Sequence, residues 1–225
     1  ATLNVLVNLF ITSCLHLRDA RFKFLCEAFT VVNKSLPPSG AIAGIYCAND
    51  NQRGVWHAPA NMSVSGISDI NVRISDKQQG ELNEDTSGKC INAIRAFQGK
   101  GILVWGARTL DGLSSEWKYI SVRRFFNYVE ESIQESTAWA VFQPNDANTW
   151  VKVRCQIENF LSNLWRDGAL AGSTPQEAFY VRVGINQTMT AQDILNGYMI
   201  VEIGMAAVRP AEFIVLQFSH KLQES

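Results

Sequence analysis

Two long amphipathic patterns in the second half of the chain constrain its fold more than any other feature. In residues 122–139 the apolar side chains recur at helical spacing, at Val122, Phe125, Phe126, Val129 and Ile133. The same spacing continues in residues 146–165, at Trp150, Val153, Ile157, Phe160, Leu161 and Leu164. Asp146 is a candidate N-cap of the second segment, and Gly168 follows its expected end. The sequence therefore predicts two long helices, each with one apolar face to bury.

Shorter apolar segments around these helices predict strands. Residues 91–97 and 102–107 are separated by Gln98-Gly99-Lys100-Gly101, a glycine-containing link that is typical of a β-hairpin. Further strands are expected at residues 70–74, 178–183, 198–208 and 212–219, with a polar helix or loop at 76–85 and a short helix starting near Thr190. The predicted class is α/β (α+β), a mixed β-sheet flanked by helices.

The first third of the chain reads as helical segments broken by proline. We expect a helix at residues 17–29, a stop at Pro37-Pro38, and a packing helix from Ser39 to Tyr46 with Ser39 as its N-cap. Residues 49–61 are rich in turn formers and predict a loop. The apolar segment 1–17 lacks a basic region and a cleavage site and is short for a membrane span, so a buried strand or helix is expected.

Charge and cysteine content exclude several classes of protein. The chain has 20 basic and 21 acidic residues and a net charge of -1. This balance gives no excess of positive charge for binding nucleic acid or an anionic membrane. The five cysteines are odd in number, scattered and without a CxxC pair. Reduced thiols are the expected state.

No local sequence motif indicates a catalytic site. Gly99-Lys100-Gly101 leads into a strand rather than a helix, so it predicts a hairpin turn and not a phosphate-binding loop. None of the three histidines has metal-ligand spacing to another ligand, and no nucleophile motif is present. We predict no catalytic, cofactor-binding or metal-binding residues, and a protein that is not an enzyme.

Aromatic residues divide by context. Trp105 and Trp139 lie in apolar runs and are expected in the core, whereas Trp56 and Trp117 lie in loop-like contexts. For these two, packing against a neighbouring chain is an open alternative.

The last apolar segment of the chain is a nearly unbroken β-favouring run. It consists of Phe213, Ile214, Val215, Leu216, Gln217 and Phe218. An exposed edge strand of this kind aggregates unless it is paired. Two interpretations remain open: a buried strand of the chain's own sheet, or a strand that pairs with a sheet of another copy.

Ordered motifs also run through the chain from residue 37 to its end. They include Pro37-Pro38-Ser39-Gly40-Ala41-Ile42-Ala43-Gly44, Arg53-Gly54-Val55-Trp56, Ile91-Asn92-Ala93-Ile94-Arg95, Val104-Trp105-Gly106-Ala107-Arg108-Thr109-Leu110, Glu158-Asn159-Phe160-Leu161, Trp165-Arg166-Asp167-Gly168-Ala169-Leu170 and Arg209-Pro210-Ala211-Glu212-Phe213-Ile214. Together they resemble the contractile tail-sheath family, and they look most like sheath proteins of phage-tail-like extracellular injection systems. Family members are usually longer, and the chain begins with alanine, so a fragment or a short variant is expected.

The resemblance implies a tail-sheath C-terminal domain fold and a structural role. Family subunits form stacked hexameric rings around an inner tube, and contraction drives the tube through a target envelope. The implied partners are further copies of the chain, the inner tube protein, and baseplate and cap proteins, with no direct membrane insertion. Assembly is expected in the bacterial cytoplasm, as part of a phage tail or a released phage-tail-like particle.

Carried onto this chain, the resemblance also assigns segments. The run from Phe213 to Phe218 matches the family's final strand, and we predict that it pairs between subunits. The expected organisation is an N-terminal segment at residues 1–36, whose role the motifs do not assign, and a sheath core at 37–225. The alternative is a cap or baseplate component of the same machine that carries a sheath-like domain.

Overall fold

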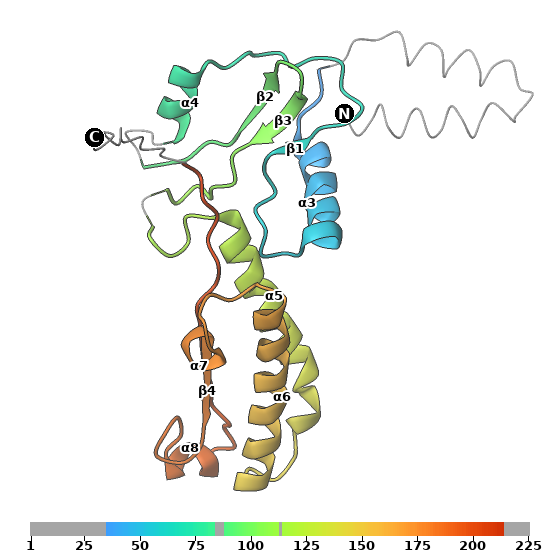
Figure 1. Ribbon diagram of the computed structural model, residues 1–225. Helices are drawn as coiled ribbons and strands as arrows, with labels where there is room; N and C mark the ends of the chain where they lie inside the picture. The colour runs from blue at the N-terminus through green and yellow to red at the C-terminus, as the bar shows by residue number, and fades with distance from the viewer. Residues whose placement is uncertain (1–34, 84–87, 113, 214–225) are drawn as a thin grey trace, which may run out of the picture.

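The computed structural model describes residues 35–83, 88–112 and 114–213, and its elements form two lobes (Figure 1). The sheet lobe contains α3 (Ser39–Arg53), β1 (Met62–Ser63), α4 (Asp76–Asn83), β2 (Ala93–Phe97) and β3 (Gly101–Trp105). The helical lobe contains α5 (Ile120–Ser136), the 3-10 helix η1 (Ala138–Ala140), α6 (Ala147–Arg166), α7 (Pro175–Ala178), β4 (Phe179–Val183), α8 (Ala191–Leu195) and β5 (Val201–Met205). Helix α5 starts beside the sheet lobe and runs into the helical lobe, so it joins the two.

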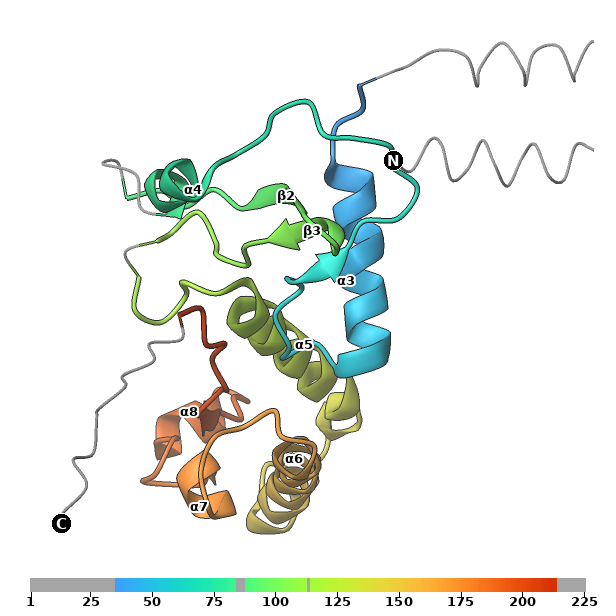
Figure 2. The same ribbon diagram turned by 45° about the horizontal axis from the view of Figure 1, so that its top comes forward.

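The sheet lobe is built on a three-stranded antiparallel sheet with the order β1-β3-β2. Strands β2 and β3 pair from Ala93↔Trp105 to Phe97↔Gly101, so the predicted hairpin is confirmed. Gly99 and Gly101 have φ angles of 76° and 79°, a region that glycine adopts at no steric cost. Helix α3 packs against this sheet (Figure 2), and the small core between them centres on Ile45, Val64 and Val104.

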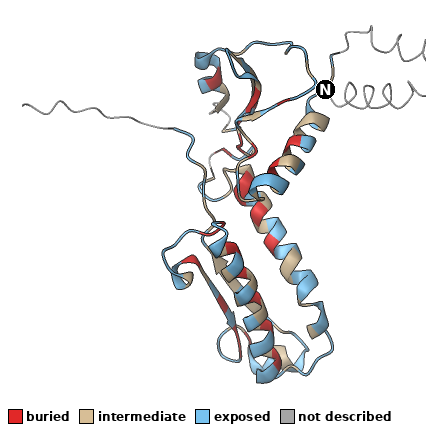
Figure 3. Ribbon diagram, turned by 45° about the vertical axis from the view of Figure 1, so that its right-hand side comes forward, coloured by how far each residue is buried: buried red, intermediate tan, exposed pale blue. Residues whose placement is uncertain are grey.

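The helical lobe holds the larger core. Helices α5 and α6 lie side by side, and their buried faces turn toward each other and toward β4 (Figure 3). The residues of this core with 2% exposure or less are Phe125, Val129, Val153, Ile157, Leu161, Ala169 and Ala178. Both predicted amphipathic helices are confirmed, with α5 beginning two residues earlier and ending three residues earlier than the pattern indicated.

Local capping signals place the helix ends in this lobe. The Asp146 carboxylate accepts a hydrogen bond from the Thr149 backbone N–H at 2.9 Å, which lowers the pKa of Asp146. Gly168 has a φ of 84° just past the end of α6. Thr190 and Asp193 form a capping box at the start of α8, where the short helix was predicted.

Strands β4 and β5 form a separate two-stranded antiparallel ribbon. Its register places Val181 opposite Ile203 and Tyr180 opposite Gly204. Val181 and Val183 are buried against the helices, and Tyr180 and Arg182 point to the exposed face. The α/β class is confirmed, with the strands of the described residues in two small antiparallel sheets instead of one.

Three local predictions were wrong. Residues 70–74 form no strand but an extended loop, whose Ile74 carbonyl accepts a hydrogen bond from the Arg95 guanidinium. Pro38, not Ser39, occupies the N-cap position of α3. The helix also continues to Arg53, because the fully buried Asn49 donates from its side chain to the His57 carbonyl and so closes the helix end against the following loop.

The tryptophans also differ from expectation. Trp105 and Trp139 are not in the core, with 36% and 41% of their surfaces exposed. Trp105 instead lies against Phe97 on the outer face of the hairpin, and the Trp139 indole N–H donates to Gln156. Trp56, one of the two loop tryptophans, packs inside the chain against Phe125.

The link between α5 and α6 carries Phe142, which is fully exposed and has a φ of 65°. Replacing Phe142 with glycine is expected to raise the free energy of unfolding by about 1 kcal/mol, because glycine adopts this backbone conformation without strain and no buried contact is lost. Urea unfolding measures the change. Val141→Gly is the matched control, since Val141 is exposed but has a φ of -64°, and this variant should lose stability. Equal losses in both variants would contradict the prediction.

Candidate functional site

The candidate site is the place where the C-terminal segment leaves the folded body. After β5, residues 206–208 run beside residues 169–171, with hydrogen bonds from Ala171 N to Ala206 O (2.8 Å) and from Val208 N to Ala169 O (3.2 Å). The chain then turns back toward the sheet lobe, as the red segment in Figure 1 shows. The helical lobe therefore holds this segment by its backbone up to Val208.

The sheet lobe holds the same segment through an ion pair between Arg108 and Glu212. The Arg108 Nε lies 2.9 and 3.0 Å from the two Glu212 carboxylate oxygens, and Nη2 lies 2.6 Å from Oε2. The Arg108 side chain is 4% exposed and that of Glu212 is 22% exposed. This forked, charge-assisted geometry is the strong form of the arginine–carboxylate interaction. Hydrogen bonding to Glu212 is also the main cause that raises the pKa of Arg108.

Other groups of the sheet lobe hold Arg108 in place. The Asn92 side chain accepts from the Arg108 backbone N–H (2.9 Å) and donates to its carbonyl (2.8 Å). The Arg108 Nη1 donates to the Asn83 carbonyl at 2.8 Å and lies 3.7 Å from the Cys90 sulfur. These contacts position the guanidinium from within the sheet lobe and do not involve the C-terminal segment.

Tyr119 completes the arrangement. Its hydroxyl lies 3.5 Å from a Glu212 carboxylate oxygen. Burial and then the nearby Glu212 charge raise the pKa of Tyr119, so the hydroxyl stays protonated as a donor. We call this group the C-terminal anchor: Asn83, Cys90, Asn92, Arg108, Tyr119 and Glu212.

The predicted inter-subunit strand begins directly at this anchor. Phe213 follows Glu212 and is 71% exposed. Ile214, Val215, Leu216, Gln217 and Phe218 lie outside the described residues. Sequence reasoning missed the anchor itself, although Arg108 and Glu212 both stand in the motifs that carry the family resemblance. A glutamate immediately before an apolar run was the available signal.

The β4–β5 ribbon offers open strand edges. In the part of the chain that the structure describes, neither strand pairs with a third strand, and no backbone hydrogen bond joins their outer edges to another element. The exposed face of the ribbon carries polar side chains, and the Tyr180 hydroxyl donates a hydrogen bond to the Glu202 carboxylate at 2.8 Å. A strand with an unpaired row of N–H and C=O groups is a template for a further strand.

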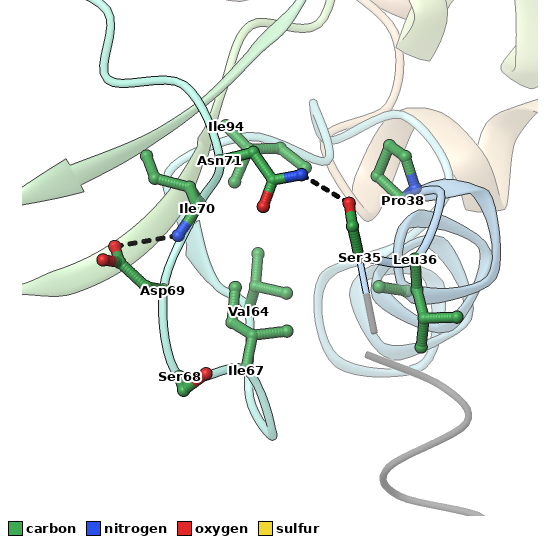
Figure 4. Close-up of a pocket in the computed structure, with 11 residues that line it drawn as sticks. Ser35, Leu36, Pro38, Val64, Ile67, Ser68, Asp69, Ile70, Asn71 and Ile94 are labelled. Carbon is green, nitrogen blue, oxygen red and sulfur yellow. Dashed lines mark hydrogen bonds between the residues drawn. The ribbon is translucent and has the colours of Figure 1, made fainter. Parts of the chain in front are cut away.

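One pocket lies in the sheet lobe, between the start of α3, the sheet and residues 67–71 (Figure 4). Its volume is about 290 Å³, and Leu36, Val64, Ile67 and Ile94 supply most of its apolar wall. Asp69 is the one ionisable residue in the lining, and its carboxylate accepts a hydrogen bond from the Ile70 backbone N–H, as the dashed line marks. This pocket brings together no pair of groups for acid–base or nucleophilic catalysis.

Other chemical sites have no support within residues 35–83, 88–112 and 114–213. No group of three or more His, Cys, Asp or Glu side chains there has the arrangement for a metal ion. None of the described helices combines the length and apolar composition that a membrane span requires. Cys47, Cys90 and Cys155 are free thiols, and Cys14 and Cys26 lie outside the described residues.

Comparisons with known proteins agree with the motifs. Residues 114–221 match the profile of the family described as the phage tail sheath C-terminal domain. A chain from the PVC sheath complex of an extracellular contractile injection system, in the contracted state, is 46% identical with a TM-score of 0.80, over 84% of this chain and 52% of that chain. A chain from the anti-feeding prophage baseplate is 49% identical with a TM-score of 0.79, over 84% of this chain and 51% of that chain.

A curated relative extends the match toward the N-terminus. The tail sheath protein of Vibrio phage KVP40 is 23% identical over 216 residues, which cover 95% of this chain and 31% of that protein. The chain therefore spans about a third of this relative. It spans about half the length of the two solved chains.

These findings define the class: the chain is of the tail-sheath type, and its residues 114–221 match the phage tail sheath C-terminal domain. Within this class it is similar to chains of the PVC and anti-feeding prophage injection systems. The predicted resemblance is confirmed.

Proposed function

We propose that this protein is a structural subunit of a contractile sheath. In this proposal, copies of the chain polymerise as stacked hexameric rings around an inner tube, and contraction of the assembly drives the tube through a target envelope. The single observation that carries the proposal is the likeness to a chain of the PVC sheath complex in the contracted state, at 46% identity and a TM-score of 0.80.

The proposal assigns residues 37–225 to the sheath core and residues 213–218 to pairing between subunits. The exposed Phe213 and the open edges of the β4–β5 ribbon support a strand exchange of this kind. Main-chain hydrogen bonds across a shared sheet depend little on side-chain packing. Such a joint therefore survives when rigid subunits rotate and slide during contraction.

Further partners follow from the same role. We propose contacts with an inner tube protein and with baseplate and cap proteins, and assembly in the bacterial cytoplasm as part of a phage tail or a released particle. The energy for contraction would lie in the difference between two subunit packings, so the role requires no catalytic site in this chain.

A second candidate is a baseplate or cap component that carries a sheath-like domain. The likeness to a chain of the anti-feeding prophage baseplate favours it, at 49% identity. The two roles differ in self-assembly, because a sheath subunit polymerises without limit and a baseplate or cap component occupies a single layer.

Negative-stain electron microscopy of the full-length protein, alone and with its tube protein, tests the proposal. We expect hollow cylinders with helical striations. Small particles of one size in both samples would overturn the sheath role and favour the baseplate or cap role.

A further inference from the structure

We infer that the Arg108–Glu212 pair is a positioning device for assembly: it fixes the point and the direction in which the C-terminal strand leaves one subunit toward the next. The inference rests on the proposed function, since it concerns the strand at residues 213–218. It adds residues of the sheet lobe to the machinery of inter-subunit pairing.

The part of the anchor that binds Glu212, the Arg108 guanidinium, is positioned within the sheet lobe. Asn92 holds the Arg108 backbone on both sides, and the Asn83 carbonyl accepts from its Nη1. The guanidinium therefore faces Glu212 in a fixed orientation. Its planar fork requires the carboxylate to approach along one direction, which a point charge such as lysine does not impose.

The C-terminal segment is bound to both lobes. Residues 206–208 are bonded to residues 169–171 in the helical lobe, and Glu212 is bonded to Arg108 in the sheet lobe, 104 positions earlier in the chain. The segment between them, residues 209–211, is thus held at both ends (Figure 1). Phe213, the next residue, is exposed.

The ion pair also shortens the tether, the stretch of chain between the last held residue and the middle of the proposed strand. With the anchor closed, the middle of the strand at Leu216 lies four residues beyond the last held residue, Glu212. Among the described residues, the preceding backbone bond to the folded body is at Val208, so without the ion pair the length of chain from there to Leu216 is eight residues, twice as long. Because the effective concentration of a tethered group falls with about the 3/2 power of tether length, pairing weakens roughly threefold per contact. Loss of the fixed direction weakens it further.

Burial of Arg108 favours the formed state of the Arg108–Glu212 ion pair. Arg108 is almost fully buried, and the loss of the Glu212 carboxylate removes a charge-assisted bond from a guanidinium that water barely reaches. A simple structural role for the pair would also follow from this burial, so the experiment has to separate folding from assembly.

Glu212→Gln tests the inference in the full-length protein, with Asp50→Asn as the matched control. Asp50 forms a similar pair with Arg124, its side chain is 25% exposed, and its hydrogen bonds in the described part of the chain go to Arg124 and not to residues 206–213. We expect Glu212→Gln to raise the critical concentration for sheath assembly at least threefold, measured by sedimentation, while Asp50→Asn leaves it unchanged. Equal critical concentrations in Glu212→Gln and the unaltered protein would overturn the inference.

A second variant keeps the test valid if Glu212→Gln fails to fold. In Arg108→Met with Glu212→Met, an apolar pair replaces the buried charges and lacks directional bonds, and the Asn83 carbonyl loses its bond from Arg108 Nη1. The inference predicts that this variant, where circular dichroism shows it folded, assembles at least threefold more weakly. Full recovery of assembly in this variant would identify the pair as merely structural.

Failure of the inference is distinguishable from failure of the proposed function. Removal of residues 214–225 tests strand pairing directly. If that removal abolishes assembly and the anchor variants assemble normally, only the anchor inference is wrong. If the shortened chain assembles, the strand-pairing proposal itself is wrong.

Discussion

Phe125→Ala is expected to lower the free energy of unfolding by about 3–5 kcal/mol, the range for truncating a fully buried phenylalanine. Phe125 has no exposed surface and lies in the main core with Val129 and Leu161. Its ring also meets Trp56 edge-on, with centroids 6.4 Å apart, at the junction with the sheet lobe. A cavity at this place removes packing from both lobes, and the loss is a large part of the stability of a typical domain.

Urea unfolding followed by tryptophan fluorescence measures the effect, because Trp56 reports on the same contact. Glu131→Ala is the matched control on the same helix, since Glu131 is exposed and its loss should change stability by less than about 0.5 kcal/mol. A loss below about 1 kcal/mol in Phe125→Ala would show that α5 does not pack as described.

Removal of residues 214–225 is expected to leave the protein folded and to abolish its polymerisation. The two cores that the structure describes and the C-terminal anchor lie before residue 214, so the shortened chain keeps these contacts. It loses Ile214, Val215, Leu216 and Phe218, which supply the strand that we propose to pair with a neighbouring sheet. Circular dichroism and thermal unfolding report on the fold, and electron microscopy reports on assembly.

The matched control removes residues 219–225 alone. This variant keeps the whole run from Phe213 to Phe218, and it should still assemble. An unfolded or insoluble product after removal of 214–225 would instead place the run in the chain's own core, the other interpretation that the sequence left open.

Local signals in the sequence predicted local structure well. Asp146, Gly168 and Thr190 placed helix ends because capping depends on atoms within a few residues of the chain. The glycine-containing link at residues 98–101 predicted the hairpin for the same reason. The family resemblance also came from residues in a fixed order, which no tertiary contact is needed to recognise.

Most of the errors occurred where contacts outside the local segment decide the outcome. Residues 70–74 alternate like a strand, but an extended segment becomes a strand only when another strand lies beside it. Helix α3 runs past its predicted end because Asn49 is buried against the carbonyls of the following loop. Trp105 and Trp139 are half-exposed, since an apolar sequence context does not determine which face of an element meets the core.

Periodicity, capping and motif order are properties of neighbouring residues, and they were enough to predict the α/β class, the two long amphipathic helices, the hairpin and the likeness to tail sheaths. The division of the described strands into two antiparallel sheets, and the pairing of Arg108 with Glu212 across 104 positions, could be found in three dimensions alone. An ion pair of this kind depends on how two lobes pack and on the burial that removes water from the charges. For that reason, the group that holds Glu212, just before the proposed C-terminal strand, becomes visible in the tertiary structure and not along the sequence.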